Sequence, residues 1–202
     1  MRTFGPISVK LVNGDITRRV VDVIVSAAND QLSMGGGVAG AIRSGGGISI
    51  HTEALEHAPA KLGSVVRTGA GELLADHVYH AVVIRFDLKG GTSAATVREV
   101  VRSVLARAVA DDVATLALPL FGAGVGGLSI QQSLETILDA LEEFAPTVAS
   151  PLSIEVVVLG EEYEQARTVF DSFRERAARD AHEARLAEEW LKAFEEKRRG
   201  DP

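Results

Sequence analysis

The spacing of hydrophobic positions changes along the chain and predicts alternating strands and helices. Short apolar runs rich in β-branched residues predict strands at 7–12, 22–28, 63–69, 77–86, 115–120 and 152–160. Apolar residues at three- and four-residue steps predict helices that begin near Thr96 and Ile130, with shorter helical pieces at 38–44 and 49–58. Because helix and strand alternate through the second half, the pattern favours an α/β fold with a layered sheet.

The last part of the chain has a different pattern. From about residue 161 to 199, apolar residues recur at helical spacing among Glu, Arg, Lys and Asp. We therefore expect an α/β domain over 1–175 and a charged amphipathic helical extension over 176–202. An isolated helix is marginal in water unless its apolar face is buried. Our hypothesis is that the extension packs on its own domain or on a second copy of the chain, giving a homo-oligomer.

Composition and charge narrow the function classes. The 202 residues are 46% hydrophobic and 24% charged, which suits one domain with one core. The formal net charge of −7 argues against a basic nucleic-acid-binding surface. The absence of cysteine excludes disulfides, thiolate metal sites and a cysteine nucleophile. The five histidines have no metal-ligand spacing, so we expect neither a metal nor a cofactor.

One uncharged stretch, 113–134, approaches membrane-spanning length. Pro119 and four glycines interrupt it, so a strand, a loop and a helix explain it better than a transmembrane helix. The N-terminus has no apolar signal segment. We therefore expect a soluble, cytoplasmic protein with no membrane partner.

Two glycine-rich loops form the candidate phosphate-binding site. "GGGVAGAIRSGGG" at 35–47 and "LPLFGAGVGGLS" at 118–129 each follow a predicted strand and lead into a predicted helix. Such turns present backbone N–H groups and a helix N-terminus to phosphate. Glycines 122, 124 and 127 also fit a dinucleotide fingerprint, but that motif usually opens the first strand–helix unit, and no Walker Lys-Ser or Lys-Thr is present. The two loops predict one cleft that binds a diphosphate from both sides. The alternative is that the glycines are present only because a tight turn needs them for packing.

Five motifs together resemble a known family. "NGDIT", "IVSAAN", "GGGVAGAI", "YHAV" and "PLFGAGVGG" occur in the order and spacing of the macrodomains of the Appr-1″-p processing type, over about residues 7–165. The resemblance implies a three-layer α/β/α fold with a mixed, mostly parallel central sheet. It also implies a cleft for ADP-ribose or an ADP-ribosylated macromolecule.

The resemblance assigns roles to individual residues. Asp15 would accept a hydrogen bond from the adenine amino group, Ile16 would line that pocket, and Tyr163 would stack on adenine. Asn29 would face the distal ribose and is the single catalytic candidate. The two cleft walls would be formed by Gly35, Gly36, Gly37, Val38 and Ala39 on one side and Gly122, Ala123, Gly124, Val125 and Gly126 on the other. From the residues alone, Asp15 also fits an Asx turn or N-cap, Asn29 a turn former, and Tyr163 a core or surface aromatic.

The chain departs from the family pattern at three places. Ala39 stands where one hydrolytic branch carries an Asp that positions water, and many members carry an aromatic at the position of Gly126 or Leu128. "VIRFD" replaces the usual Gly-Pro after "HAV". We therefore favour an ADP-ribose-binding module and leave the question of catalysis open.

Two alternatives remain. The first is a hydrolase that removes ADP-ribose from an acidic side chain, deacetylates O-acetyl-ADP-ribose or dephosphorylates ADP-ribose 1″-phosphate. The second is a structural assembly protein built on the same scaffold. Any catalysis would be substrate-assisted or electrostatic, through loop amides aimed at developing charge.

Overall fold

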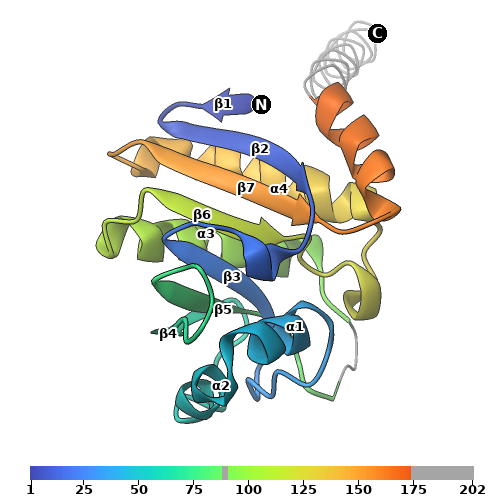
Figure 1. Cartoon of the computed structure of the whole chain (residues 1–202). Coiled ribbons are helices and arrows are strands. Elements are labelled where there is room, and N and C mark those ends of the chain that lie inside the picture. Colours follow the sequence, from blue (N-terminus) through green and yellow to red (C-terminus); the bar gives the residue numbers. More distant parts are fainter. Residues whose placement is uncertain (88–90, 174–202) are drawn as a thin grey trace, which may run out of the picture.

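A seven-stranded mixed sheet organises the computed structural model, which describes residues 1–87 and 91–173 (Figure 1). The strand order is β1-β2-β7-β6-β3-β5-β4, with only the edge strands β1 and β4 antiparallel to their neighbours. The strands are β1 Arg2–Phe4, β2 Ile7–Asn13, β3 Val23–Asn29, β4 Val65–Gly69, β5 His77–Ile84, β6 Thr115–Pro119 and β7 Leu152–Val158. The five central strands are parallel, so their carboxyl ends meet at one edge of the sheet.

Helices cover both faces of this sheet, as Figure 1 shows. On one face α3 (Ala94–Ala110) and α4 (Ile130–Phe144) bury their apolar stripes in the larger core cluster. On the other face α1 (Gly37–Gly46) packs on β3, α2 (Ile48–Leu55) on β4 and the 3-10 turn η1 (Ile16–Arg18) on β6, over the second core cluster. The expected three-layer α/β/α fold with a mixed, mostly parallel sheet is confirmed.

Alternation along the strands explains the two cores. On β7, Ile154, Val156 and Val158 belong to the cluster under α3 and α4, whereas Val157 faces the cluster under α1. Glu155 lies between them and points to the same face as Val157, because side chains alternate along a strand. A buried carboxylate on a central strand is unusual and bears on the site described below.

The number of strands and the end of one strand differ from the sequence prediction. The short strand β1 was not predicted, because three residues give too few positions for a periodic signal. Strand β5 ends at Ile84, two residues before the predicted end at 86. A helical segment at 162–173 follows β7 and lies against β1: Phe4 and Phe173 meet edge to face at 6.3 Å, and the Arg2 guanidinium donates to the carbonyl of Phe170.

The predicted domain boundary and the membrane question complete the comparison with the sequence. The domain boundary near 175 and the extension at 176–202 lie outside the described residues, and with them the oligomer hypothesis. Within 1–87 and 91–173, no helix is both long and apolar enough to cross a membrane.

Candidate functional site

A cavity of about 280 Å³ opens at the carboxyl edge of the sheet. It is lined by residues after β2, β6 and β7, by the first turn of α1 and by the loop that contains the 3-10 turn η2 (Gly124–Gly126). The lining residues are Gly14, Asp15, Ile16, Gly37, Val38, Ala41, Pro119, Leu120, Ala123, Gly124, Val157, Val158, Leu159 and Glu162. Both glycine-rich loops therefore reach one cleft, which we call the main cleft.

The first loop leaves helix amides without a side-chain partner. Gly36 is the N-cap residue of α1 and makes no side-chain capping hydrogen bond, whereas Ser93 and Ser129 cap α3 and α4. Gly37 adopts φ +55, a left-handed conformation that favours glycine. A Cβ at Gly36 or Gly37 would meet no atom within 4 Å. An anion can thus approach these N–H groups directly, aided by the positive end of the helix dipole.

The second loop divides into a packed part and an open part. A Cβ at Gly122 would overlap the Thr92 methyl group, and the buried Gly126 accepts a hydrogen bond from the Thr92 amide at 2.9 Å. Ala123 and Gly124 line the main cleft, and a Cβ at Gly124 would meet no atom within 4 Å. Glycine is thus needed for packing at 122 and leaves the backbone open at 124.

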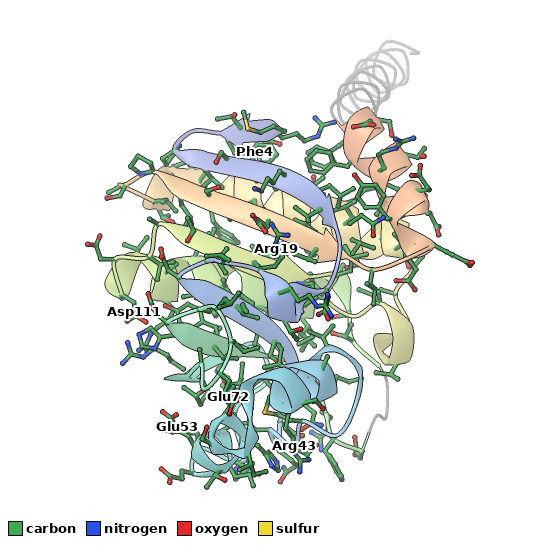
Figure 2. All side chains as sticks on the ribbon, viewed as in Figure 1. Phe4, Arg19, Arg43, Glu53, Glu72 and Asp111 are labelled. Carbon is green, nitrogen blue, oxygen red and sulfur yellow. The ribbon has the colours of Figure 1, made fainter. Side chains whose placement is uncertain are left out.

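Val125 does not line the main cleft and is 80% exposed at the tip of the second loop. Gly35 and Gly36 line a neighbouring hollow of about 690 Å³ with Arg43, and Gly37 belongs to both cavities. We call this second cavity the Arg43 hollow. Figure 2 shows Arg43 on α1. The first loop therefore separates two cavities.

Asp15 lines the main cleft and also caps η1. Its Oδ1 accepts hydrogen bonds from the Thr17 amide at 2.9 Å and the Thr17 hydroxyl at 2.8 Å, while Oδ2 lies 3.9 Å from Nε of Arg18. The hydrogen bonds from Thr17 lower the pKa of Asp15. Asp15 is therefore ionised near neutral pH, and the buried Ile16 forms the cleft wall beside it.

Asn29 ends β3 but does not line the main cleft. Its Oδ1 accepts from the amides of Gln31 at 3.1 Å and Ser33 at 3.3 Å, and its Nδ2 donates to the Ser33 hydroxyl at 2.9 Å. Its side chain thus organises the turn that follows β3, which is the alternative role that the sequence left open.

Ala39 and Tyr163 also lie away from the lining. Ala39 is buried within α1, and Tyr163 packs half-buried against the larger core. Leu159 and Glu162 line the main cleft instead. Sequence reasoning missed both: the predicted strand at 152–160 contained Leu159, whereas β7 ends at Val158.

An ion-pair cluster around the buried Glu155 ties η1 to the sheet. Glu155 on β7 accepts from Arg19 Nε at 2.5 Å and from Arg19 Nη2 at 3.1 Å, and its Oε1 lies 2.8 Å from Lys10 Nζ. Figure 2 shows Arg19 over this face of the sheet. Burial alone would raise the pKa of Glu155, but the hydrogen bonds from Arg19 and Lys10 outweigh it and lower that pKa. Because Arg19 is the C-cap of η1, the cluster ties the turn that carries Asp15.

Within the described part of the chain, no group of three or more His, Asp or Glu side chains could hold a metal ion. His80 is fully buried on β5, with Nε2 3.0 Å from the Thr68 hydroxyl. Burial, followed by the charges of His51 and His57, lowers the pKa of His80 to about 4. Its environment therefore favours the neutral ring.

Sequence comparison identifies related chains. The family model described as Macro domain matches residues 25–137. An uncharacterized protein of Pyrobaculum aerophilum is 39% identical over 171 residues, which cover 82% of this chain and 92% of that relative. An uncharacterized protein of Mycobacterium tuberculosis is 34% identical over 140 residues, or 69% of this chain and 38% of that longer relative.

Structure comparison identifies the same fold in solved proteins. The macrodomain of Oceanobacillus iheyensis with ADP matches with a TM-score of 0.77 at 22% identity, over 87% of this chain and 96% of that chain. The macrodomain of Trypanosoma brucei in complex with ADP-ribose matches with a TM-score of 0.71 at 24% identity, over 79% of this chain and 68% of that chain.

Proposed function

This chain belongs to the Macro domain family, and we propose that its main cleft binds ADP-ribose, free or attached to a macromolecule. The observation that carries the proposal is the approach of both glycine-rich loops to one cavity. The Oceanobacillus and Trypanosoma macrodomains, solved with ADP and with ADP-ribose, support the choice of ligand.

The binding mode follows from the chemistry of the walls. The first amides of α1 and the backbone around Gly124 would donate to the two phosphates. Asp15, ionised and next to Ile16, would accept from the adenine amino group in a charge-assisted hydrogen bond. Asn29 lies outside the lining of the main cleft, so the distal ribose would extend beyond that lining toward the end of β3, where Asn29 holds the turn. No cationic side chain lines the main cleft among the described residues, so main-chain amides provide the positive character.

A steric test addresses the cleft without straining its backbone. Ala123 has φ −67, which any L-residue can adopt, and its side chain is half-buried in the cleft wall. Ala123→Leu should fill the phosphate space and reduce ADP-ribose affinity by at least about 100-fold, roughly 3 kcal/mol. Isothermal titration calorimetry with ADP-ribose provides the measurement.

Val125→Leu is the matched control, because Val125 belongs to the same loop but is not part of the lining of the main cleft and is highly exposed. It should bind ADP-ribose like the wild type. Equal affinities of wild type and Ala123→Leu would refute the proposed site, and absence of wild-type binding would refute the function.

Turnover assays separate binding from hydrolysis. The buried Ala39 offers no carboxylate, which favours binding over the Asp-dependent route of the related hydrolases. ADP-ribosylated protein should therefore persist when incubated with the wild-type chain. Release of ADP-ribose that is lost in Asn29→Ala would instead identify a hydrolase.

A further inference from the structure

The segment after β5 places an exposed aromatic side chain at the carboxyl edge of the sheet. Phe86 is 57% exposed, yet its amide donates to Oδ1 of Asp30 at 2.7 Å. Arg85 and Asp87 on either side pair at 3.6 Å between Nε and Oδ1. The Phe86 amide is therefore hydrogen-bonded within the fold, while its ring is left largely exposed. These residues belong to "VIRFD", the departure from the family pattern noted in the sequence.

Phe86 borders a cavity of about 480 Å³. Leu55, 45% exposed on α2, and Ala58 supply further apolar surface, and the turn after β3 supplies Asp30 and Ser33. We call this cavity the Phe86 hollow. Apolar surface exposed around a concavity is typical of a contact site, whereas a single exposed apolar side chain on a convex surface is ordinary.

Sheet order relates this hollow to the main cleft. The strands that end at the carboxyl edge follow the order β2, β7, β6, β3, β5. The main cleft lies at the ends of β2, β7 and β6, Asn29 ends β3, and the Phe86 hollow follows β5. Ser33 connects Asn29 to the Phe86 hollow. Its hydroxyl accepts a hydrogen bond from Asn29 at 2.9 Å, and the residue lines the hollow. The Phe86 hollow thus continues the site beyond Asn29.

We propose that the Phe86 hollow receives an apolar side chain of an ADP-ribosylated protein, next to the modified residue. The inference rests on the proposed function: with adenine at Asp15 and the distal ribose near Asn29, the attached macromolecule leaves the main cleft toward β5. Phe86 and Leu55 gain free energy when they cover an apolar side chain. The hollow therefore selects which modified proteins bind.

Charge favours a protein over a nucleic acid in this position. Asp30 and Asp87 against Arg85 leave the hollow with a net negative charge, and the whole chain carries −7. Phosphates next to an ADP-ribosylated nucleotide would be repelled at this surface. The Arg43 hollow, which the first glycine-rich loop separates from the main cleft, is lined by a positive side chain instead. Substitution of Arg43 therefore provides a control for the charge of the bound probe.

The test compares four probes by calorimetry: ADP-ribose, a serine-ADP-ribosylated peptide with leucine next to the serine, the same peptide with glycine there, and an ADP-ribosylated DNA oligonucleotide. The wild type should bind the leucine peptide about tenfold more tightly than the glycine peptide, a usual gain for one apolar group in a pocket. Phe86→Ala should remove this preference and leave the affinity for ADP-ribose unchanged.

Two control variants make the result specific. Leu74→Ala removes another exposed apolar side chain, 60% exposed and located before β5, and should keep the leucine preference. Arg43→Ala should also keep it. Tight ADP-ribose binding without a leucine preference, a preference lost only in Arg43→Ala, or stronger binding of the DNA probe would each overturn this inference. Failure to bind ADP-ribose at all would instead refute the proposed function.

Discussion

Asp15 serves the local structure and the main cleft with one carboxylate. Oδ1 accepts from the amide and hydroxyl of Thr17, and Oδ2 lies 3.9 Å from Nε of Arg18. The sequence alone left two roles open for this residue, an N-cap and a ligand contact. The N-cap role is observed, and Asp15 also belongs to the lining of the main cleft. The two roles are therefore compatible.

Asp15→Asn separates these roles, because an amide oxygen can still accept from Thr17 while the charge is lost. We expect ADP-ribose affinity to fall by about 1–3 kcal/mol, as for the loss of a hydrogen bond to a charged group. Calorimetry on this variant, with the exposed Asp139→Asn on α4 as the control, measures the effect. Unchanged affinity in Asp15→Asn would remove Asp15 from the adenine contact.

The elements were more predictable than the side chains in the cleft. Strong periodicity identified α3 and α4, and continuous apolar runs identified the central strands, because both signals follow from burial. Hydrophobic periodicity did not predict that Leu159 and Glu162 line the cleft, because their placement depends on the backbone path after β7. The Glu155 cluster also escaped prediction, since nothing local links residue 155 to Arg19.

The η1 turn depends on this long-range contact. Arg19→Ala should remove the tie between η1 and β7 while Lys10 still neutralises Glu155. We expect a loss of about 1–3 kcal/mol in the free energy of unfolding and weaker ADP-ribose binding, because Asp15 is held less firmly. Urea unfolding, calorimetry and amide hydrogen exchange over residues 14–18 measure these effects.

Lys10→Ala is the matched control, because it removes the other partner of Glu155 without touching η1. It should lower stability but preserve the affinity for ADP-ribose and the exchange rates at 14–18. Equal loss of affinity in the two variants would mean that the cluster supports the sheet alone.

At the scale of the whole molecule, one buried histidine links stability to pH. His80 lies inside the sheet with Nδ1 unpaired, and its pKa is about 4 in the folded state against an ordinary value of 6.5. The folded state thus disfavours the protonated ring. This contribution to stability is complete above pH 6.5 and is lost as the pH falls toward 4.

When the pH is lowered from 7 to 5, we expect the titration of His80 to reduce the free energy of unfolding by about 2 kcal/mol. Urea unfolding of the wild type and of His80→Gln at both pH values isolates this effect from the titration of carboxylates. The wild type should lose about 2 kcal/mol more than the variant over this range. Parallel losses in the two proteins would show that His80 does not control the acid response.

The accessible backbone at Gly37 and Gly124 has a consequence for mutagenesis. Where recognition is performed by peptide groups, truncating side chains removes nothing, so an alanine scan of these walls would report a silent surface. Informative substitutions add volume rather than subtract it. On the proposed binding mode, substitutions at neighbouring positions should likewise leave phosphate recognition intact for as long as residues 37 and 124 stay small.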